Sequence, residues 1–440
     1  MPNKDNLGKE PEKRRFIQEK IIKPKATGPQ VLRRFLLLGF GAVLFGFLAA
    51  VTFAVSEPLA KKYLASGETE ESSSISIPKD EPETTAVPST EETSPPETTT
   101  AVETEPLEDV VRSEVEKYEF SAEELTAMFA SLNQVIQQTD KGIVAVHSVK
   151  TQVDWFNNPV ETSGQYAGAV IAATRGEYLI LAPSEAVQDA DALEVILPGG
   201  AQVPGILKGF DQVAGMAVIS VDAGLLDENT VKQLAVLTLG NSYTVKQGDV
   251  IFACGSPAGV VHSSSIGGIS YVANNVQVID GNSRLFYTDT EGVAALGTFV
   301  FNAKGQLIGW MTDDYQTNNT SIRVVRALSN YKGVLEKLSN GIPAPYLGIM
   351  GKEVPAERQA EGLPAGIYVN RAITDSPAYN AGIQNGDIIT RIGETSFATM
   401  KEFQNCLDKL AAGDVVAVEV QRYGREAYAS IEYEVIIGSR

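Results

Sequence analysis

The sequence has few of the residues on which nucleophilic and metal chemistry depend. Its 440 residues include two Cys and two His. Cys254 and Cys406 are far apart and form no C-x-x-C motif, so we expect neither a disulfide scaffold nor a cysteine-based metal site. Both are expected to pack as small buried hydrophobes. Any Ser-His or Cys-His mechanism would have to recruit His147 or His262 as its base.

Basic residues are also scarce, with 36 Lys and Arg against 55 Asp and Glu and a formal net charge of −19. This balance argues against a nucleic-acid partner, because phosphate contacts need a clustered basic face. The charge is unevenly distributed: residues 1–34 hold ten Lys or Arg and four Asp or Glu, whereas residues 66–109 hold thirteen Asp or Glu and one Lys. The sequence therefore predicts a basic tail at one end of a longer, acidic chain.

A run of 21 residues without a charge, 35–55, follows the basic tail. Its length suffices for a helix to cross the roughly 30 Å of a bilayer core. Arg33 and Arg34 lie at its N-terminal end, so the positive-inside rule predicts a cytoplasmic tail, 1–34, and an extracytoplasmic remainder. We therefore expect a single-pass protein of the cell membrane. The alternative is a cleaved signal peptide, which would have a shorter apolar core and a small-x-small cleavage site.

Residues 56–109 are predicted to form a disordered linker. Within them, 66–109 contain 11 Glu, 9 Thr, 7 Ser and 6 Pro, a composition that cannot bury enough apolar surface to offset chain entropy. Such a spacer holds the following domains away from the membrane. A glycosylated or cell-wall-spanning stalk is the alternative.

The next segment, 110–341, is predicted to be a folded, β-rich domain. Ser121 and Glu124 form a capping-box pattern before a helical stripe, Leu125 to Ile136, that we expect to pack in the core. Short apolar runs bounded by turn residues follow and predict a β-barrel or sandwich. These runs are 143–149, 166–173, 178–182, 193–200, 203–211, 216–221, 249–257, 277–289 and 297–312.

The order of two motifs in this segment makes a family resemblance visible. GSPAGVVHSSSIGGIS (255–270) resembles the G-N-P-x-G…G-x-V-S segment of the HtrA (high-temperature-requirement A) serine proteases, and FVFNAKGQLIGW (299–310) resembles the segment after their nucleophile. The resemblance covers about 125–435. It implies a trypsin-like double β-barrel and, for the family, serine endopeptidase activity in protein quality control.

The three positions at which the family carries its catalytic triad differ in this sequence. LAPSEAV has Glu185 at the position of the base, DQVAGMA has Gly215 at the position of the orienting acid while keeping Asp211, and AALGTF has Leu296 at the position of the nucleophile. A one-residue shift would place Ala295 there instead. None of these supplies a nucleophilic atom or an orienting group, and a carboxylate is a weak base for a hydroxyl. We therefore predict no catalytic residues.

Other residues offer weak replacements. His147 lies in an alternating strand pattern, and His262 precedes three serines in a stretch that matches the family framework. Thr298 with Glu185 would be a makeshift pair. The sequence has no H-E-x-x-H spacing and no P-loop or Rossmann glycine pattern after a strand, so no metal or cofactor is expected.

The last segment, 342–440, contains SPAYNAGIQNGDII (376–389), which resembles a PDZ domain of the HtrA type. The resemblance implies that a loop offers backbone N–H groups to the terminal carboxylate of a peptide that adds as a strand. We expect this loop to be Tyr346, Leu347, Gly348 and Ile349. Three residues at helical spacing are expected either to line the apolar ligand pocket or to pack the domain core: Met400, Phe403 and Leu407.

We therefore predict a mainly β protein: a trypsin-like double β-barrel and an α+β PDZ domain, preceded by one transmembrane helix and a disordered linker. The preferred hypothesis is a membrane-anchored pseudoprotease that binds exported or unfolded proteins, or C-terminal peptide segments, in scaffolding or quality control. It could form the trimers typical of the family, as copies or with active relatives. The alternatives are a residual serine endopeptidase and a structural envelope protein.

Overall fold

A computed structural model describes residues 74–81, 121–153, 159–316 and 321–440. The predicted tail 1–34, the predicted span 35–55 and most of the predicted linker 56–109 lie outside the described residues. Within the described ranges, no helix is both long and apolar enough to traverse a bilayer.

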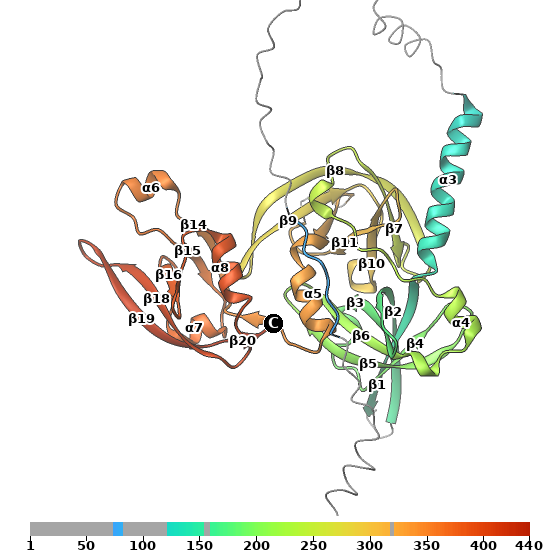
Figure 1. Cartoon of the computed structure of the whole chain (residues 1–440), viewed down its shortest axis with the longest axis horizontal. Helices are drawn as coiled ribbons and strands as arrows, with labels where there is room; N and C mark the ends of the chain where they lie inside the picture. Colours follow the sequence, from blue (N-terminus) through green and yellow to red (C-terminus); the bar gives the residue numbers. More distant parts are fainter. Residues whose placement is uncertain (1–73, 82–120, 154–158, 317–320) are drawn as a thin grey trace, which may run out of the picture. The chain divides into compact units, whose positions relative to one another are not determined.

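Six antiparallel strands close into a first barrel in the order β1-β2-β3-β6-β5-β4 (Figure 1). Alternating side chains point inward, and Val146, Ile180, Val195 and Ile219 are fully buried in its centre. The strands are β1 (Ile143–Val153), β2 (Pro159–Ala173), β3 (Glu177–Pro183), β4 (Ala192–Ile196), β5 (Gln202–Asp211) and β6 (Met216–Asp222).

A second barrel closes in the order β10-β11-β12-β9-β8-β7. Phe252 and Phe301, from adjacent strands, stack with ring centroids 5.3 Å apart in a core that also includes side chains of the first barrel. The strands are β7 (Val250–Gly255), β8 (Ser263–Val278), β9 (Gly281–Thr288), β10 (Thr298–Asn302), β11 (Leu307–Thr312) and β12 (Arg323–Ala327). β8 and β9 form a long, curved hairpin (Figure 1). The expected double barrel is thus confirmed.

The C-terminal domain is the expected α+β unit. Its sheet has the strand order β14-β15-β16-β18-β19, with β17 paired to β16, and β13 pairs with β20. The strands are β13 (Pro345–Tyr346), β14 (Ile349–Glu353), β15 (Ile367–Ala372), β16 (Ile388–Ile392), β17 (Thr395–Ser396), β18 (Val415–Tyr423), β19 (Tyr428–Ile436) and β20 (Gly438–Ser439). The helices are α6 (Ala356–Ala360), α7 (Pro377–Ala381) and α8 (Met400–Leu407).

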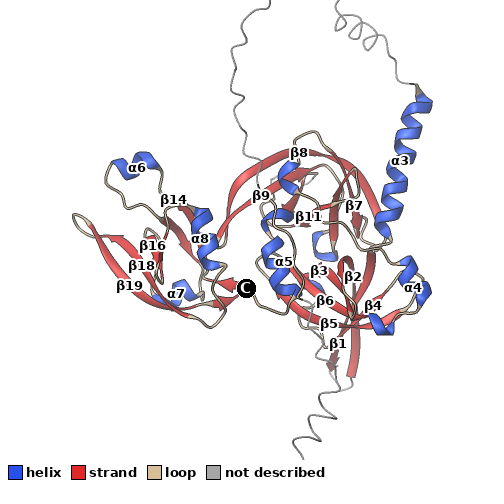
Figure 2. Ribbon diagram, viewed as in Figure 1, coloured by secondary structure: helices blue, strands red, loops and turns tan. Residues whose placement is uncertain are grey.

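Helices are few and lie at the margins of the barrels (Figure 2). They are α3 (Ala122–Asp140), α4 (Glu228–Gln233) and α5 (Lys332–Ser339). The predicted capping box is confirmed at α3, where Ser121 and Glu124 exchange side-chain to backbone hydrogen bonds. The expectation of core packing along α3 is wrong for its first half, because Leu125, Met128 and Phe129 are exposed. Only the last turns of the helix reach the second barrel.

Eight residues of the predicted linker, 74–81, are packed against α5. The side chain of Asn340 bonds to both the N–H and the C=O of Ile75, and Ile77 is buried in the core between the barrels. Asp80 pairs with Lys332, whose Nζ lies 2.8 Å from its carboxylate. For these eight residues the prediction of disorder is wrong, because two isoleucines and one paired carboxylate give them contacts that the average composition conceals.

Candidate functional site

The structure brings together the three segments that resemble the triad motifs. Glu185 lies in the short 3-10 helix η1 (Ser184–Ala186) and Leu296 in the 3-10 helix η4 (Ala294–Leu296), and the two helices are in contact. The N–H of Ser184 donates to the C=O of Gly215 over 3.3 Å. The three segments that the resemblance named thus lie together between the barrels, and their assignment to the triad positions stays a prediction.

The side chains of Glu185, Gly215 and Leu296 themselves provide no hydroxyl, thiol or imidazole. Glu185 is exposed, and its carboxylate accepts a hydrogen bond from the hydroxyl of Ser184 over 3.3 Å. Gly215 has a positive φ of 69° and open space where a Cβ would be. Leu296 is half-buried and aliphatic. These three positions thus contribute a solvated carboxylate, an open position without a side chain and a hydrocarbon.

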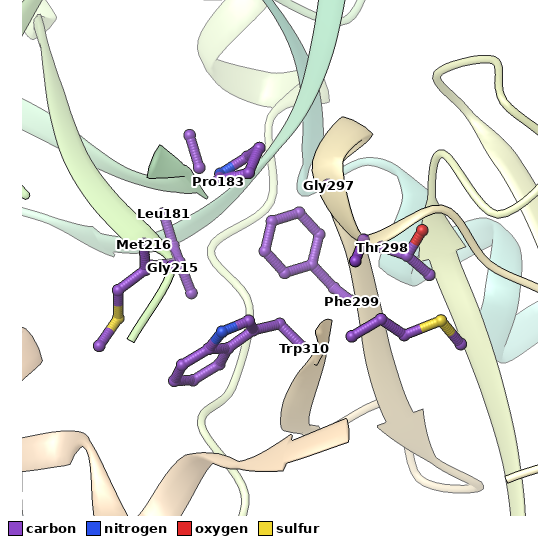
Figure 3. Close-up of a pocket in the computed structure, with 11 residues that line it drawn as sticks. Leu181, Pro183, Gly215, Met216, Gly297, Thr298, Phe299 and Trp310 are labelled. Atoms are coloured by element: carbon purple, nitrogen blue, oxygen red, sulfur yellow. The ribbon is translucent and has the colours of Figure 1, made fainter. Parts of the chain in front are cut away.

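The space between these segments is filled by large apolar side chains. Figure 3 shows the Phe299 ring lying between the segment Leu181 to Pro183 and the turn at Gly297, with the Trp310 ring near Gly215 and Met216. Phe299 is 2% exposed, and the indole N–H of Trp310 donates to the C=O of Ala214 over 3.1 Å. The remaining cavity is about 10 Å³, which is the room that one water molecule needs.

The turn at Gly297 is held tightly. Gly297 has a φ of 84°, and a Cβ at this position would lie 2.4 Å from the C=O of Ala167. Its N–H donates to the C=O of Ala294 over 3.0 Å and so closes the 3-10 turn. This N–H is therefore used within the turn.

The histidines have structural surroundings. Nδ1 of His262 lies 3.1 Å from the carboxylate of Asp140, at the end of α3. The hydrogen bond to Asp140 raises the pKa of His262 above its ordinary value, against the smaller, opposing effect of burial. His147 lies on β1, between Gln165 of β2 and Glu194 of β4. Among the described residues, no hydrogen bond joins either histidine to a Ser or Thr hydroxyl.

Thr298 and the two cysteines also have structural surroundings, in a loop and in the core. The hydroxyl of Thr298 donates to the C=O of Val293 and accepts its N–H, so it fixes the loop before β10. Cys254 and Cys406 are buried and unbridged, as expected. Burial raises the pKa of the Cys254 thiol to about 12, so a thiolate is not available near neutral pH.

The predicted carboxylate-binding loop of the C-terminal domain has the geometry of an anion site. The N–H groups of Leu347, Gly348 and Ile349 all donate to one carboxylate, that of Asp280, over 2.9 to 3.0 Å. Gly348 has a φ of 86°, which lets consecutive N–H groups point the same way. Tyr346, the fourth predicted residue, pairs with Gly438 instead.

Comparison with known proteins agrees with this architecture. The trypsin-like peptidase domain model matches residues 167–309, and the PDZ domain model matches residues 345–433. The serine protease Do-like HtrA of Lactobacillus helveticus is 26% identical over 299 residues, which are 63% of this chain and 70% of that protein. The serine endoprotease DegS of Escherichia coli is 25% identical over 305 residues, 67% of this chain and 82% of that protein. The chain is thus similar to the HtrA-type serine proteases in sequence and in the order of its two domains.

Among solved structures, a variant of the HtrA-type protease AlgW with a decapeptide superposes on this HtrA-like chain with a TM-score of 0.50 at 22% identity. The match covers 70% of this chain and 97% of that one. At this identity the likeness supports the fold.

The three predicted pocket residues of the PDZ domain lie in its core. Met400, Phe403 and Leu407 are buried, and the ring of Phe403 packs edge-on against Phe397 at 5.4 Å. The capping box of Thr399 and Glu402 starts their helix, α8. The core-packing interpretation thus describes their contacts, and a role in lining a ligand pocket stays a prediction.

Two charged residues of this HtrA-like chain were missed by sequence reasoning. Asp280 is the second residue of the two-residue turn between β8 and β9, and Arg440 is a cation with 13% of its side chain exposed, whose guanidinium lies 3.7 Å from the buried carboxylate of Asp211. The turn pair, Ile279-Asp280, is not one of the Asn-Gly, Asp-Gly or Gly-Gly pairs that signal a two-residue hairpin. No local pattern indicates that this turn contacts a segment 67 residues further along the chain.

Proposed function

We propose that this protein is a membrane-anchored HtrA-like pseudoprotease, which binds exported or unfolded proteins through their C-terminal segments at its PDZ domain. One observation carries this proposal: the N–H groups of Leu347, Gly348 and Ile349 converge on a single carboxylate. A free peptide C-terminus presents the same two oxygens, and an extended peptide can add to the edge of β14 as a further strand. Its role would be to scaffold or sense such chains.

The pseudoprotease part of the proposal is supported by the residues at the triad positions and by the packing around them. Glu185, Gly215 and Leu296 supply no nucleophile, and the adjacent cavity has room for about one water. A residual serine endopeptidase is the second candidate, which the names of the relatives favour. The two candidates differ in whether turnover is expected.

The membrane and assembly parts of the proposal rest on the sequence. The uncharged run 35–55 and the basic tail 1–34 support a single-pass anchor with a cytoplasmic N-terminus and extracytoplasmic domains. The family resemblance supports trimers, formed by copies of this chain or with active relatives.

A binding experiment on the full chain in mild detergent tests the proposed function. A library of labelled decapeptides with randomised C-termini and free carboxylates is compared with the same library amidated at the C-terminus. We expect binding of some free-carboxylate peptides and loss of that binding on amidation. Binding that does not depend on the terminal carboxylate, or no binding, would count against the proposal.

An activity assay on the same protein separates the two candidates. Casein and fluorogenic peptides are incubated with the full chain, with and without a covalent serine-protease inhibitor. We expect no inhibitor-sensitive turnover. Reproducible turnover that the inhibitor titrates would instead support the endopeptidase.

A further inference from the structure

The carboxylate-binding loop of the PDZ domain is already occupied by a residue of the same chain. Asp280, at the tip of the β8–β9 hairpin of the second barrel, is 1% exposed. Its Oδ1 accepts the N–H groups of Gly348 and Ile349 over 2.9 and 3.0 Å, and its Oδ2 accepts the N–H of Leu347 over 2.9 Å. Both oxygens are thus satisfied by consecutive backbone donors.

The hairpin tip also adds to the PDZ domain as a strand. Ile279 forms an antiparallel bridge with Met350, and the N–H of Asp280 donates to the C=O of Ile349 over 2.7 Å. This is the β-strand addition by which an extended peptide joins a sheet edge. The tip therefore uses the backbone groups at the start of β14 that an added ligand strand would need.

Helix α8 contacts the hairpin from the other side. The side-chain amide of Gln404 donates to the C=O of Asn282 over 3.5 Å. A Cβ on Gly281 would lie 2.0 Å from the same amide, so only glycine fits at this position without a shift of Gln404. The tip is thus enclosed between β14 and α8.

The chemistry of this contact is that of a chain terminus. A turn residue whose side chain ends in a carboxylate presents two oxygens with no chain beyond them, as a peptide C-terminus does. Asp280 has a φ of 59°, a left-handed conformation that Asp tolerates better than most residues, and this conformation belongs to a two-residue turn. One loop cannot hold two carboxylates, so occupation by Asp280 excludes a peptide terminus.

Opposing contributions act on the buried carboxylate of Asp280 in this docked position. Burial raises the pKa of Asp280, whereas the charge of Arg440 and the three N–H groups act in the opposite direction. A buried carboxylate is costly even when its hydrogen bonds are complete. The contact between the hairpin and the loop is therefore one that a competing carboxylate can replace.

We propose that Asp280 is an internal ligand of the carboxylate-binding loop, and that the β8–β9 hairpin must leave the PDZ domain before a peptide C-terminus can bind. This inference rests on the proposed function, because it presumes that C-terminal peptides are the ligands. A tethered competitor acts at an effective concentration of about millimolar or more. The apparent affinity for a peptide is then the intrinsic affinity multiplied by the fraction of loops that the competitor leaves free. Ligands are then restricted to chains with a free C-terminal carboxylate that bind tightly enough to displace the hairpin.

The experiment compares the full chain with Asp280→Ala, with Asp280→Asn, which keeps the shape of the side chain, and with Asp289→Asn. Asp289 is a matched control, because it also accepts a backbone N–H near this hairpin, that of Gly268 over 2.8 Å. The probes are the free-carboxylate decapeptide library and its amidated version. We expect both variants at position 280 to lower the Kd of free-carboxylate peptides about tenfold or more, with no change in the control.

A measurement without peptide tests the docking itself. Hydrogen exchange at the amides of Leu347, Gly348 and Ile349 should become about tenfold faster or more in Asp280→Ala than in the wild type and in Asp289→Asn. Equal peptide affinity in the wild type and Asp280→Ala would overturn the competition but leave the proposed function intact. Faster exchange without peptide binding to either protein would overturn both. Unchanged exchange would overturn the internal ligand.

Discussion

The cleft between the barrels and the carboxylate-binding loop of the PDZ domain differ in the atoms from which each site is built. A triad consists of side chains, and in the cleft between the barrels the side chains of Glu185, Gly215 and Leu296 supply no hydroxyl, thiol or imidazole. The loop consists of backbone N–H groups, and those of Leu347 to Ile349 still converge on a carboxylate. Three substitutions can abolish a site built from side chains. A site built from backbone N–H groups persists as long as the chain follows the same path.

The two regions also differ in how they are filled. Aromatic side chains such as Phe299 and Trp310 occupy the cleft as members of the core between the barrels. The loop is filled by Asp280, whose carboxylate satisfies the N–H groups that a ligand would satisfy. Packing of the aromatic side chains stabilises the fold, whereas docking of Asp280 regulates the access of peptide C-termini to the loop.

The largest expected effect tests whether the cleft is core. Phe299→Ala should lower the free energy of unfolding by about 3–5 kcal/mol, because the ring is buried and its removal leaves a cavity. Phe210→Ala is the matched control: this ring is 45% exposed on β5, and its loss should cost much less. Urea unfolding measures both. A loss below about 1 kcal/mol at Phe299 would show that the cleft is a binding site held open rather than packed.

The next effect tests the loop with two glycines of positive φ. A Cβ at Gly348 would lie 2.2 Å from Cβ of Ser376, whereas a Cβ at Gly386 meets nothing within 4 Å. Gly386→Ala should therefore cost only the left-handed strain of about 1–2 kcal/mol, and Gly348→Ala should cost more and weaken peptide binding. Thermal unfolding and peptide titration separate the two contributions. Equal losses for both variants would mean that the loop is loosely packed.

A smaller effect concerns the contact between α3 and the second barrel. The pKa of His262 is raised above its ordinary value of 6.5 by its bond to Asp140. The folded state therefore binds the proton more tightly than the unfolded chain, and this stabilisation is complete below 6.5 and is lost as the pH rises through the raised pKa. We expect His262→Gln to lower the melting temperature more at about pH 5.5 than at about pH 8.5. Asp140→Asn should reproduce this difference, and a pH-independent loss would contradict it.

Sequence patterns predicted the structural features that depend on residues close together in the chain. The capping box at Ser121 and Glu124, the short strands and the SPAYNAGIQNGDII motif each specify structure within a few residues, and the motif order then identified both domains. The segments that meet between the barrels could be named in advance because each lies in a recognisable motif.

Contacts between distant segments were not predictable in this way. Asp280 belongs to a turn of ordinary composition, and its role depends on a loop 67 residues away. Ile75 and Ile77 stand in a Glu- and Thr-rich stretch whose average composition predicts disorder, yet they pack against α5. In both cases the contact is stabilised by burial against a distant segment, which no local sequence pattern identifies.

The smallest effect is expected where a hydroxyl is restored to the cleft. Leu296→Ser should change the free energy of unfolding by less than about 1 kcal/mol, because Leu296 is only half-buried at the end of η4. It should also yield no peptidase activity, because an attacking hydroxyl needs a base, and His262 is held by Asp140 while Glu185 faces solvent beside Ser184. Casein and fluorogenic-peptide assays with a covalent serine-protease inhibitor measure this, with the exposed Leu225→Ser as the matched control. Turnover that appears only in Leu296→Ser and is blocked by the inhibitor would show that the cleft still supplies a base. A single residue, Leu296, would then separate the cleft from a working site, as the carboxylate-binding loop is expected to be.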